Sequence, residues 1–149
     1  MTAVAIRLVT ALIGTVGFAM IFRVGRRHMV WAALGGLLTY AVYELVTQLG
    51  GEALIAAFLS SLFMTLYSEA LARILRAPAI TFLFPCAIPI VPGSSLYYTV
   101  YNLLFYDLNK LLHYGKNTLS IALGMAVGMG VASIIVGVAL QAAKAIRRE

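Results

Sequence analysis

Charged residues are scarce in this chain, and their scarcity excludes an ordinary soluble domain. Only 11% of the 149 residues are Asp, Glu, Lys or Arg, whereas 62% are hydrophobic. Soluble domains average about 25% charged residues, so this chain has too few charges to cover a globule of its size. The composition therefore predicts a protein whose surface faces lipid.

The residues that carry thiol, metal and phosphate chemistry are also few. Cys86 is the only cysteine, so an internal disulfide or a thiolate zinc site is excluded. His28 and His113 lie far apart, and the sequence contains no Ser/His/Asp pattern, no paired carboxylates and no glycine-rich phosphate loop. We therefore expect no enzyme activity, no metal and no cofactor.

Acidic residues are rarer than basic ones, and the formal net charge is +6. An excess of basic charge in a soluble protein favours nucleic-acid binding, but no basic run with interleaved aromatic residues lies outside an apolar stretch here. In a membrane protein the same residues mark the cytoplasmic ends of the spans. We therefore expect a membrane environment and no nucleic-acid partner.

Several apolar stretches reach the ~20 residues with which a helix crosses ~30 Å of hydrocarbon. The first is too long for the apolar part of a signal peptide and lacks a cleavage site before the arginines that follow it. The expected fold is all-α, with residues 1–149 forming one polytopic transmembrane domain of about five crossings. The predicted spans are Ala3–Phe22, Met29–Leu49, Ala53–Ala72, a proline-broken Pro78–Leu112 and Leu119–Ala142.

The distribution of Lys and Arg predicts the orientation. If the proline-broken segment crosses once, eight of the 11 basic residues lie on one side of the membrane. These eight are Arg23, Arg26, Arg27, Arg73, Arg76, Lys144, Arg147 and Arg148, and the other three are Arg7, Lys110 and Lys116. Because basic residues favour the cytoplasmic side, we expect a multi-pass protein of the inner (plasma) membrane with its N-terminus outside and its C-terminus in the cytoplasm.

The fourth span contains the most informative pattern of the sequence. Pro85, Pro89 and Pro92 each lack an N–H and clash with the carbonyl four residues earlier. The carbonyls of Thr81, Pro85 and Ile88 are therefore expected to have no helical partner. A bilayer tolerates such backbone only where it is buried in protein or faces water, which predicts a broken helix beside a path or a site.

The break is expected at Pro92-Gly93, because glycine permits turns that other residues resist. A straight helix over Pro78–Leu112 would run about 50 Å, more than the ~30 Å hydrocarbon core. Gly93, Ser94 and Ser95 would then begin a second half-helix, whose free N–H groups favour an anion. We expect this turn to receive the carboxylate of a small substrate.

Polar residues follow the break at helical spacing, and they leave two interpretations open. Ser95, Thr99, Asn102, Tyr106, Asn109 and His113 share one face if the helix continues through them. This face is either the wall of an aqueous path or part of an interfacial helix on the outer surface, with its tyrosines at headgroup level.

Three charged residues are further candidates for function, and a ridge of small residues is a candidate for helix packing. Glu44 and Glu69 lie inside spans, where ionisable groups are often functional. Each is a candidate for proton coupling, and the alternative for each is that its side chain reaches the interface. Arg7 is expected to extend to the outer interface. Gly124, Gly128 and Ala132 permit close helix packing, either within the chain or against a partner chain.

The stretch from Ser68 to Arg73, the pair Pro78-Ala79, the stretch from Ile88 to Gly93 and Tyr97 resemble the threonine/serine exporter family. The likeness is greatest to its short split-subunit form, the YjjB-like subunit, which matches the C-terminal half of fused exporters. The resemblance implies an inner-membrane exporter of small carboxylate metabolites, either threonine and serine or a dicarboxylate such as succinate. It also implies a second, YjjP-like subunit, and we expect proton coupling.

An accessory subunit that stabilises a partner and forms no path is the alternative function, and a homo-oligomer is also left open. For an exporter, one set of residues is expected to bind substrate or line its path: Pro85, Pro89, Pro92, Gly93, Ser94, Ser95, Thr99, Asn102 and Glu69.

Overall fold

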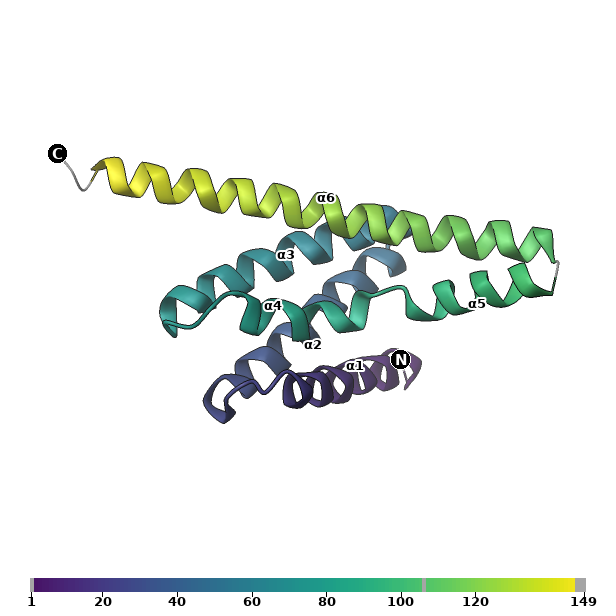
Figure 1. Cartoon of the computed structure of the whole chain (residues 1–149), viewed down its shortest axis with the longest axis horizontal. Helices are drawn as coiled ribbons and strands as arrows, with labels where there is room; N and C mark the ends of the chain where they lie inside the picture. The colour runs from purple at the N-terminus through teal and green to yellow at the C-terminus, as the bar shows by residue number, and fades with distance from the viewer. Residues whose placement is uncertain (1, 106, 147–149) are drawn as a thin grey trace.

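All regular structure in the part of the chain described by a computed structural model, residues 2–105 and 107–146, is helical (Figure 1). The elements are α1 (Thr2–Ile21), α2 (Arg26–Gln48), α3 (Ala53–Ile74), α4 (Ile80–Ala87), the 3₁₀ turn η1 (Ile88–Ile90), α5 (Gly93–Leu104) and α6 (Leu108–Ile146). The predicted all-α class is confirmed.

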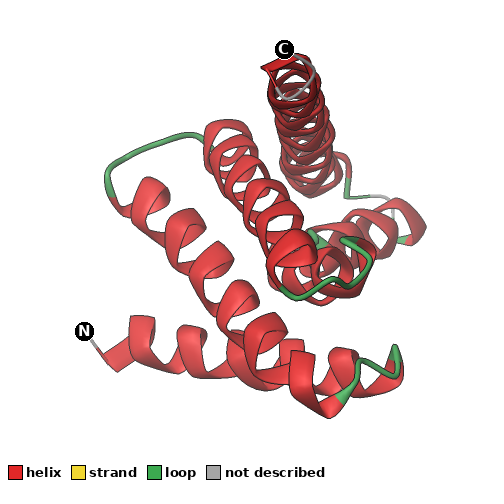
Figure 2. Cartoon of the chain, turned by 90° about the vertical axis from the view of Figure 1, so that its left-hand side faces the viewer, coloured by secondary structure: helices red, strands yellow, loops and turns green. Residues whose placement is uncertain are grey.

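Four helices, α1, α2, α3 and α6, are long and apolar enough to cross a membrane. The α4–η1 segment and α5 pass the same test only together, and they are bent by 53° relative to each other. The described residues thus contain four candidate spans, or five if the bent pair crosses as one. α3 and α6 run roughly along the long axis, whereas α1 lies largely across it (Figures 1 and 2), and the chain is a multi-pass membrane protein.

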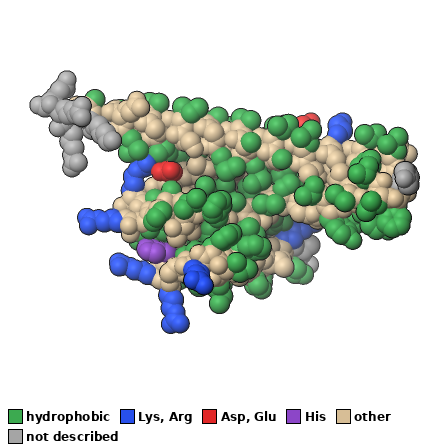
Figure 3. Space-filling model, in the orientation of Figure 1, with side chains coloured by type: hydrophobic (Ala, Val, Ile, Leu, Met, Phe, Trp, Pro, Cys, Tyr) green, Lys and Arg blue, Asp and Glu red, His purple; other side chains and the backbone are tan. Residues whose placement is uncertain are grey.

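The connections that carry basic residues meet at one end of the bundle. The α1–α2 loop, the α3–α4 connection and the C-terminal end of α6 lie there, at the left of Figure 1. Lys and Arg side chains gather at the same end in the space-filling view (Figure 3). Arg147 and Arg148, which contributed to the predicted charge asymmetry, lie outside the described residues.

Small residues allow α3 and α6 to pack closely. A Cβ at Gly124 would collide with the Leu54 carbonyl oxygen, and one at Gly128 would collide with Ser61 Oγ and the Phe58 carbonyl. Ala132, one turn further on, is fully buried. The predicted small-residue ridge therefore packs against α3 of the same chain.

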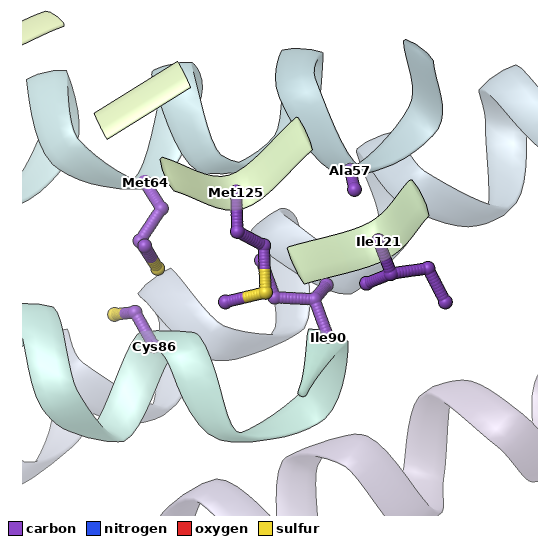
Figure 4. Close-up of a cluster of buried hydrophobic side chains, with 6 residues drawn as sticks. All are labelled: Ala57, Met64, Cys86, Ile90, Ile121 and Met125. Carbon is purple, nitrogen blue, oxygen red and sulfur yellow. The ribbon is translucent and has the colours of Figure 1, made fainter. Parts of the chain in front are cut away.

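A buried apolar cluster lies where α3, α6 and the α4–η1 segment meet (Figure 4). Its members are Ala57, Met64, Cys86, Ile90, Ile121 and Met125. Cys86 is fully buried, and its thiol lies 3.6 Å from the carbonyl oxygen of Ala32 on α2. This cluster fixes the broken segment against three spans.

The end of the fourth span differs from the prediction. α5 ends at Leu104 and α6 begins at Leu108, not at Leu119. Asp107 explains the early start, because its carboxylate accepts the backbone N–H of Lys110 at 3.2 Å, as an N-cap does. This capping signal was missed in the sequence, and the predicted continuous helix through Asn109 and His113 is wrong.

The early start makes α6 39 residues long, about 58 Å at 1.5 Å per residue. Gly124 lies level with Leu54, the second residue of α3. The part of α6 before Gly124 therefore extends about 24 Å past that level. It packs with α5 as a hairpin that projects beyond α1, α2 and α3 (Figure 1).

Candidate functional site

The backbone break in the fourth span is made by Val91 and Pro92. Val91 has φ −59° and ψ 128°, and Pro92 has φ −76° and ψ 50°. A residue before proline is driven out of the helical region by the proline Cδ, so Pro92 forces Val91 into an extended conformation. The expected broken helix is present, and its direction changes at these two residues.

Two expectations about this break are wrong. Ile88 does have a partner for its carbonyl, because the Val91 N–H lies 3.3 Å from that oxygen and 3.2 Å from the Ala87 oxygen. Gly93 is not the turning residue: it is the first residue of α5, its φ is not positive, and a Cβ there would meet nothing within 4 Å. The 3₁₀ turn tightens the chain before Pro92, which removes the need for a glycine.

A polar cavity of about 230 Å³ lies against the break. The broken segment forms one wall from Pro89 to Pro92, and Ser94 and Ser95 of α5 continue it. Tyr40 and Tyr43 of α2 and Asn117 and Ile121 of α6 complete the lining. The break thus brings hydroxyl and amide groups from three helices to one place.

Asn117 and Ser95 form the polar contact at this cavity. Asn117 Nδ2 donates a hydrogen bond to Ser95 Oγ at 2.8 Å. Ser95 is buried, and Asn117 lies about one turn before Ile121 on the same face of α6. Asn117 was missed in the sequence, because the last span was predicted to begin only at Leu119, whereas α6 begins at Leu108.

A second cavity of about 280 Å³ lies on the other side of the broken segment. It is lined by Arg7, Thr10, Ala11 and Gly14 of α1, Tyr40 of α2, and Ile88 and Pro89. Tyr40 and Pro89 line both cavities, so the two spaces are neighbours.

An ion pair between helices lies beside the second cavity. Arg7 Nη1 donates to the Glu44 carboxylate at 3.1 and 3.4 Å, and Gln48 Nε2 donates to it at 3.3 Å. The Glu44 side chain is 9% exposed, whereas that of Arg7 is 61% exposed. Among the described residues, this ion pair joins two helices, whereas the pairs at Glu69 and Asp107 lie within one turn.

Glu69 lies away from both cavities. Its carboxylate accepts a hydrogen bond from Arg73 at 3.1 Å, one helical turn further along α3. The side chain is 33% exposed, and Glu69 lines neither cavity. The two glutamates therefore differ: Glu44 is buried beside the break, and Glu69 forms a local pair near the basic end of α3.

The polar face of α5 packs against α6 along most of its length. Thr99 and Thr118 have their hydroxyl oxygens 3.4 Å apart, and Asn102 is buried with its amide bonded to the Tyr98 carbonyl. Only Ser95, at the start of this face, reaches the cavity. Asn109 and His113 belong to α6, and Tyr106 lies outside the described residues.

The fold and this site define a class: a polytopic helical membrane protein with a discontinuous element and polar groups beside it, as transporters have. The sequence profile described as Threonine/Serine exporter, ThrE matches residues 7–135, and the chain belongs to that family. The family is one of transporters and not of enzymes. Comparison with curated proteins and with solved structures gives no significant match.

Proposed function

We propose that the chain is one subunit of an inner-membrane exporter for small carboxylate metabolites, threonine and serine or a dicarboxylate such as succinate. It works with a second, YjjP-like subunit and is coupled to the proton gradient. The observation that carries this proposal is the pair of cavities on either side of the broken segment, next to the Arg7–Glu44 ion pair.

Arg7 is the group best suited to a substrate carboxylate. A guanidinium has five N–H donors in a planar fork that matches a carboxylate, and Glu44 is contacted by one of its nitrogens, Nη1. Arg7 lines the cavity beside the break. A carboxylate in that cavity would share Arg7 with Glu44, or replace Glu44 as its partner.

Glu44 is the group best suited to proton coupling. Its charge is stabilised by Arg7 and Gln48, and an unpaired carboxylate in a membrane span is costly. When a substrate carboxylate takes over Arg7, Glu44 loses its cationic partner, so a proton delivered to Glu44 would replace the lost positive charge. Substrate binding and proton binding are then linked at one pair of residues.

The open side of the two cavities supports a partner subunit. Both cavities are open at the protein surface, and α1 has exposed apolar side chains such as Ile6, Val9 and Ile13 along its length. Transporters with discontinuous helices bind substrate between two related halves. A second subunit that covers the open side would complete the path.

Metabolite efflux tests the proposal. Cells lacking both subunits would be loaded with a threonine-containing peptide or with succinate, then supplied with neither, either or both subunits. We expect efflux of one substrate only when both subunits are present, and a decrease when the proton gradient is collapsed. Efflux that persists with the second subunit alone would instead support the accessory role.

A further inference from the structure

A third cavity lies at the basic end of the bundle, away from the Arg7–Glu44 pair. Its volume is about 500 Å³, and two loops frame it. The α1–α2 loop contributes Arg23 and Gly25, and the α3–α4 connection contributes Arg76 and Pro78. The cavity therefore brings two guanidinium groups together from loops more than 50 residues apart in the sequence.

Both arginines occupy an unusual backbone conformation. Arg23 has φ 53° and Arg76 has φ 51°, and within the described residues they are the non-glycine positions with positive φ. Each arginine follows the last turn of a helix, where a left-handed residue commonly ends the helix. The Val24 N–H accordingly donates to the Ala19 carbonyl at 2.9 Å, and the Ala77 N–H donates to the Ala72 carbonyl at 3.0 Å. The two loops thus present arginine where glycine would have been less strained.

The polar groups of this cavity lack partners in the described part of the chain. None of the ion pairs formed there involves Arg23 or Arg76. His28, which also lines the cavity, has a buried Nδ1 with no hydrogen-bond partner, while its ring edge packs against Phe82. Two cations and one buried imidazole nitrogen are therefore available to an anion with several oxygen atoms.

The rest of the lining is apolar and open to the surroundings. Phe22, Ile80 and Phe84 line the same cavity, each about half exposed, and the rings of Phe22 and Phe84 stack at 5.7 Å. A small inorganic anion has no apolar surface with which to contact these side chains. An amphiphile with an anionic head and a hydrocarbon tail fits both halves of the cavity.

The location of the cavity agrees with this ligand. It lies where α1 and α3 end and α4 begins, and the ends of membrane spans are level with the lipid headgroups. Basic pockets between helices at this level bind anionic headgroups. We propose that Arg23, Arg76 and His28 bind the phosphate of an anionic phospholipid whose acyl chain lies along Phe22 and Phe84.

Native mass spectrometry of the delipidated full chain in detergent tests this site, and it does not depend on transport. The chain would be titrated with phosphatidylglycerol and with phosphatidylcholine. We expect one phosphatidylglycerol to bind with clear preference, and R23Q/R76Q to bind it about tenfold more weakly, as the loss of charge-assisted hydrogen bonds implies. R26Q/R27Q is the matched control, because it removes the same charge from neighbouring residues that do not line the cavity, and we expect less than a twofold change.

Two further comparisons separate this site from general charge attraction. Phe84→Ala leaves the charges intact and is expected to weaken phosphatidylglycerol binding severalfold without affecting inorganic phosphate. Circular dichroism of each variant confirms that it is folded. Equal losses in R23Q/R76Q and R26Q/R27Q, equal binding of the two lipids, or full displacement of phosphatidylglycerol by millimolar inorganic phosphate or succinate would each overturn the proposal.

Discussion

At the residue scale, Glu44 shows most clearly how the environment decides the role of a side chain. Glu44 and Glu69 are both glutamates inside spans, and each pairs with an arginine at 3.1 Å. Glu44 is buried and linked to another helix, whereas Glu69 is partly exposed and linked to its own turn. Surface pairs within one turn contribute a few tenths of a kcal/mol, while breaking a buried pair costs considerably more.

Glu44→Gln is therefore expected to impair both transport and stability. Removing the carboxylate leaves Arg7 without its partner, and the partial exposure of Arg7 reduces the cost to about 1–2 kcal/mol. Export should fall at least tenfold in the efflux assay, and the apparent Tm in detergent should fall measurably.

Glu69→Gln is the matched control, with export and Tm close to wild type. Similar losses in the two variants would contradict the separate roles assigned to these glutamates. The sequence alone singled out both glutamates as intramembrane carboxylates. It did not indicate the partner of Glu44, because Arg7 lies 37 residues away and nothing in local spacing reports a contact between helices.

At the element scale, the break between α4 and α5 was predicted from its prolines, but its chemistry was assigned to the wrong residue. Proline acts on the residue before it, so Val91 turns the chain and Gly93 only begins the next helix. The helix ends were also missed where Asp107 caps α6. Capping is a local signal and was available in the sequence.

Substitutions at Pro92 and Gly93 are therefore expected to differ. Pro92→Ala restores a backbone N–H and releases Val91, so the segment can straighten and the cavity at the break changes shape. We expect export to fall strongly while the protein still inserts. Gly93→Val places its side chain in open space and should retain most of the export. Loss of export in Gly93→Val with full activity in Pro92→Ala would show that Gly93, and not Pro92, makes the turn.

The α3–α6 contact gives a prediction with an internal control. Gly124→Ala would place a Cβ against the Leu54 carbonyl oxygen and 3.0 Å from the Ala57 Cβ. Overpacking of this kind costs about 1–3 kcal/mol, so thermal unfolding in detergent should occur at a lower temperature.

Gly130→Ala, on the same helix, meets nothing within 4 Å. It should leave the Tm unchanged or raise it slightly, since alanine favours a helix over glycine by about 0.5–1 kcal/mol. If Gly124→Ala were as stable as Gly130→Ala, the two helices would not approach as closely as described.

At the scale of the whole molecule, the helical membrane class and four candidate spans were predicted from hydropathy, and a fifth crossing depends on whether the bent pair of α4–η1 and α5 spans as one. These properties follow from the bilayer, which imposes length and apolarity on every span. The cavities were not predictable in this way, because Arg7, Tyr40, Tyr43 and Asn117 meet only through the packing of α1, α2 and α6 around the break. Sequence patterns indicate whether a helix faces lipid or water more directly than they indicate which helices it packs against.

The proposed orientation is tested with single cysteines in a Cys86→Ser background. Arg27→Cys and Lys116→Cys lie at opposite ends of the bundle in the predicted topology. A membrane-impermeant maleimide applied to intact cells should label Lys116→Cys and should label Arg27→Cys only after permeabilisation, since basic loops are retained in the cytoplasm. The reverse pattern would invert the assignment of both termini.

The continuous helix α6 packs against α3 in the bundle and against α5 in the projecting hairpin. Prolines break the segment from α4 to α5, but α6 is one continuous helix from Leu108 to Ile146. A rigid rod transmits rotation, so each ~10° of tilt about Gly124 would swing the far tip of the hairpin by roughly 4 Å over its ~24 Å arm. A spin label or fluorophore at Leu112 would therefore detect a tilt of α6 as a displacement of the hairpin tip.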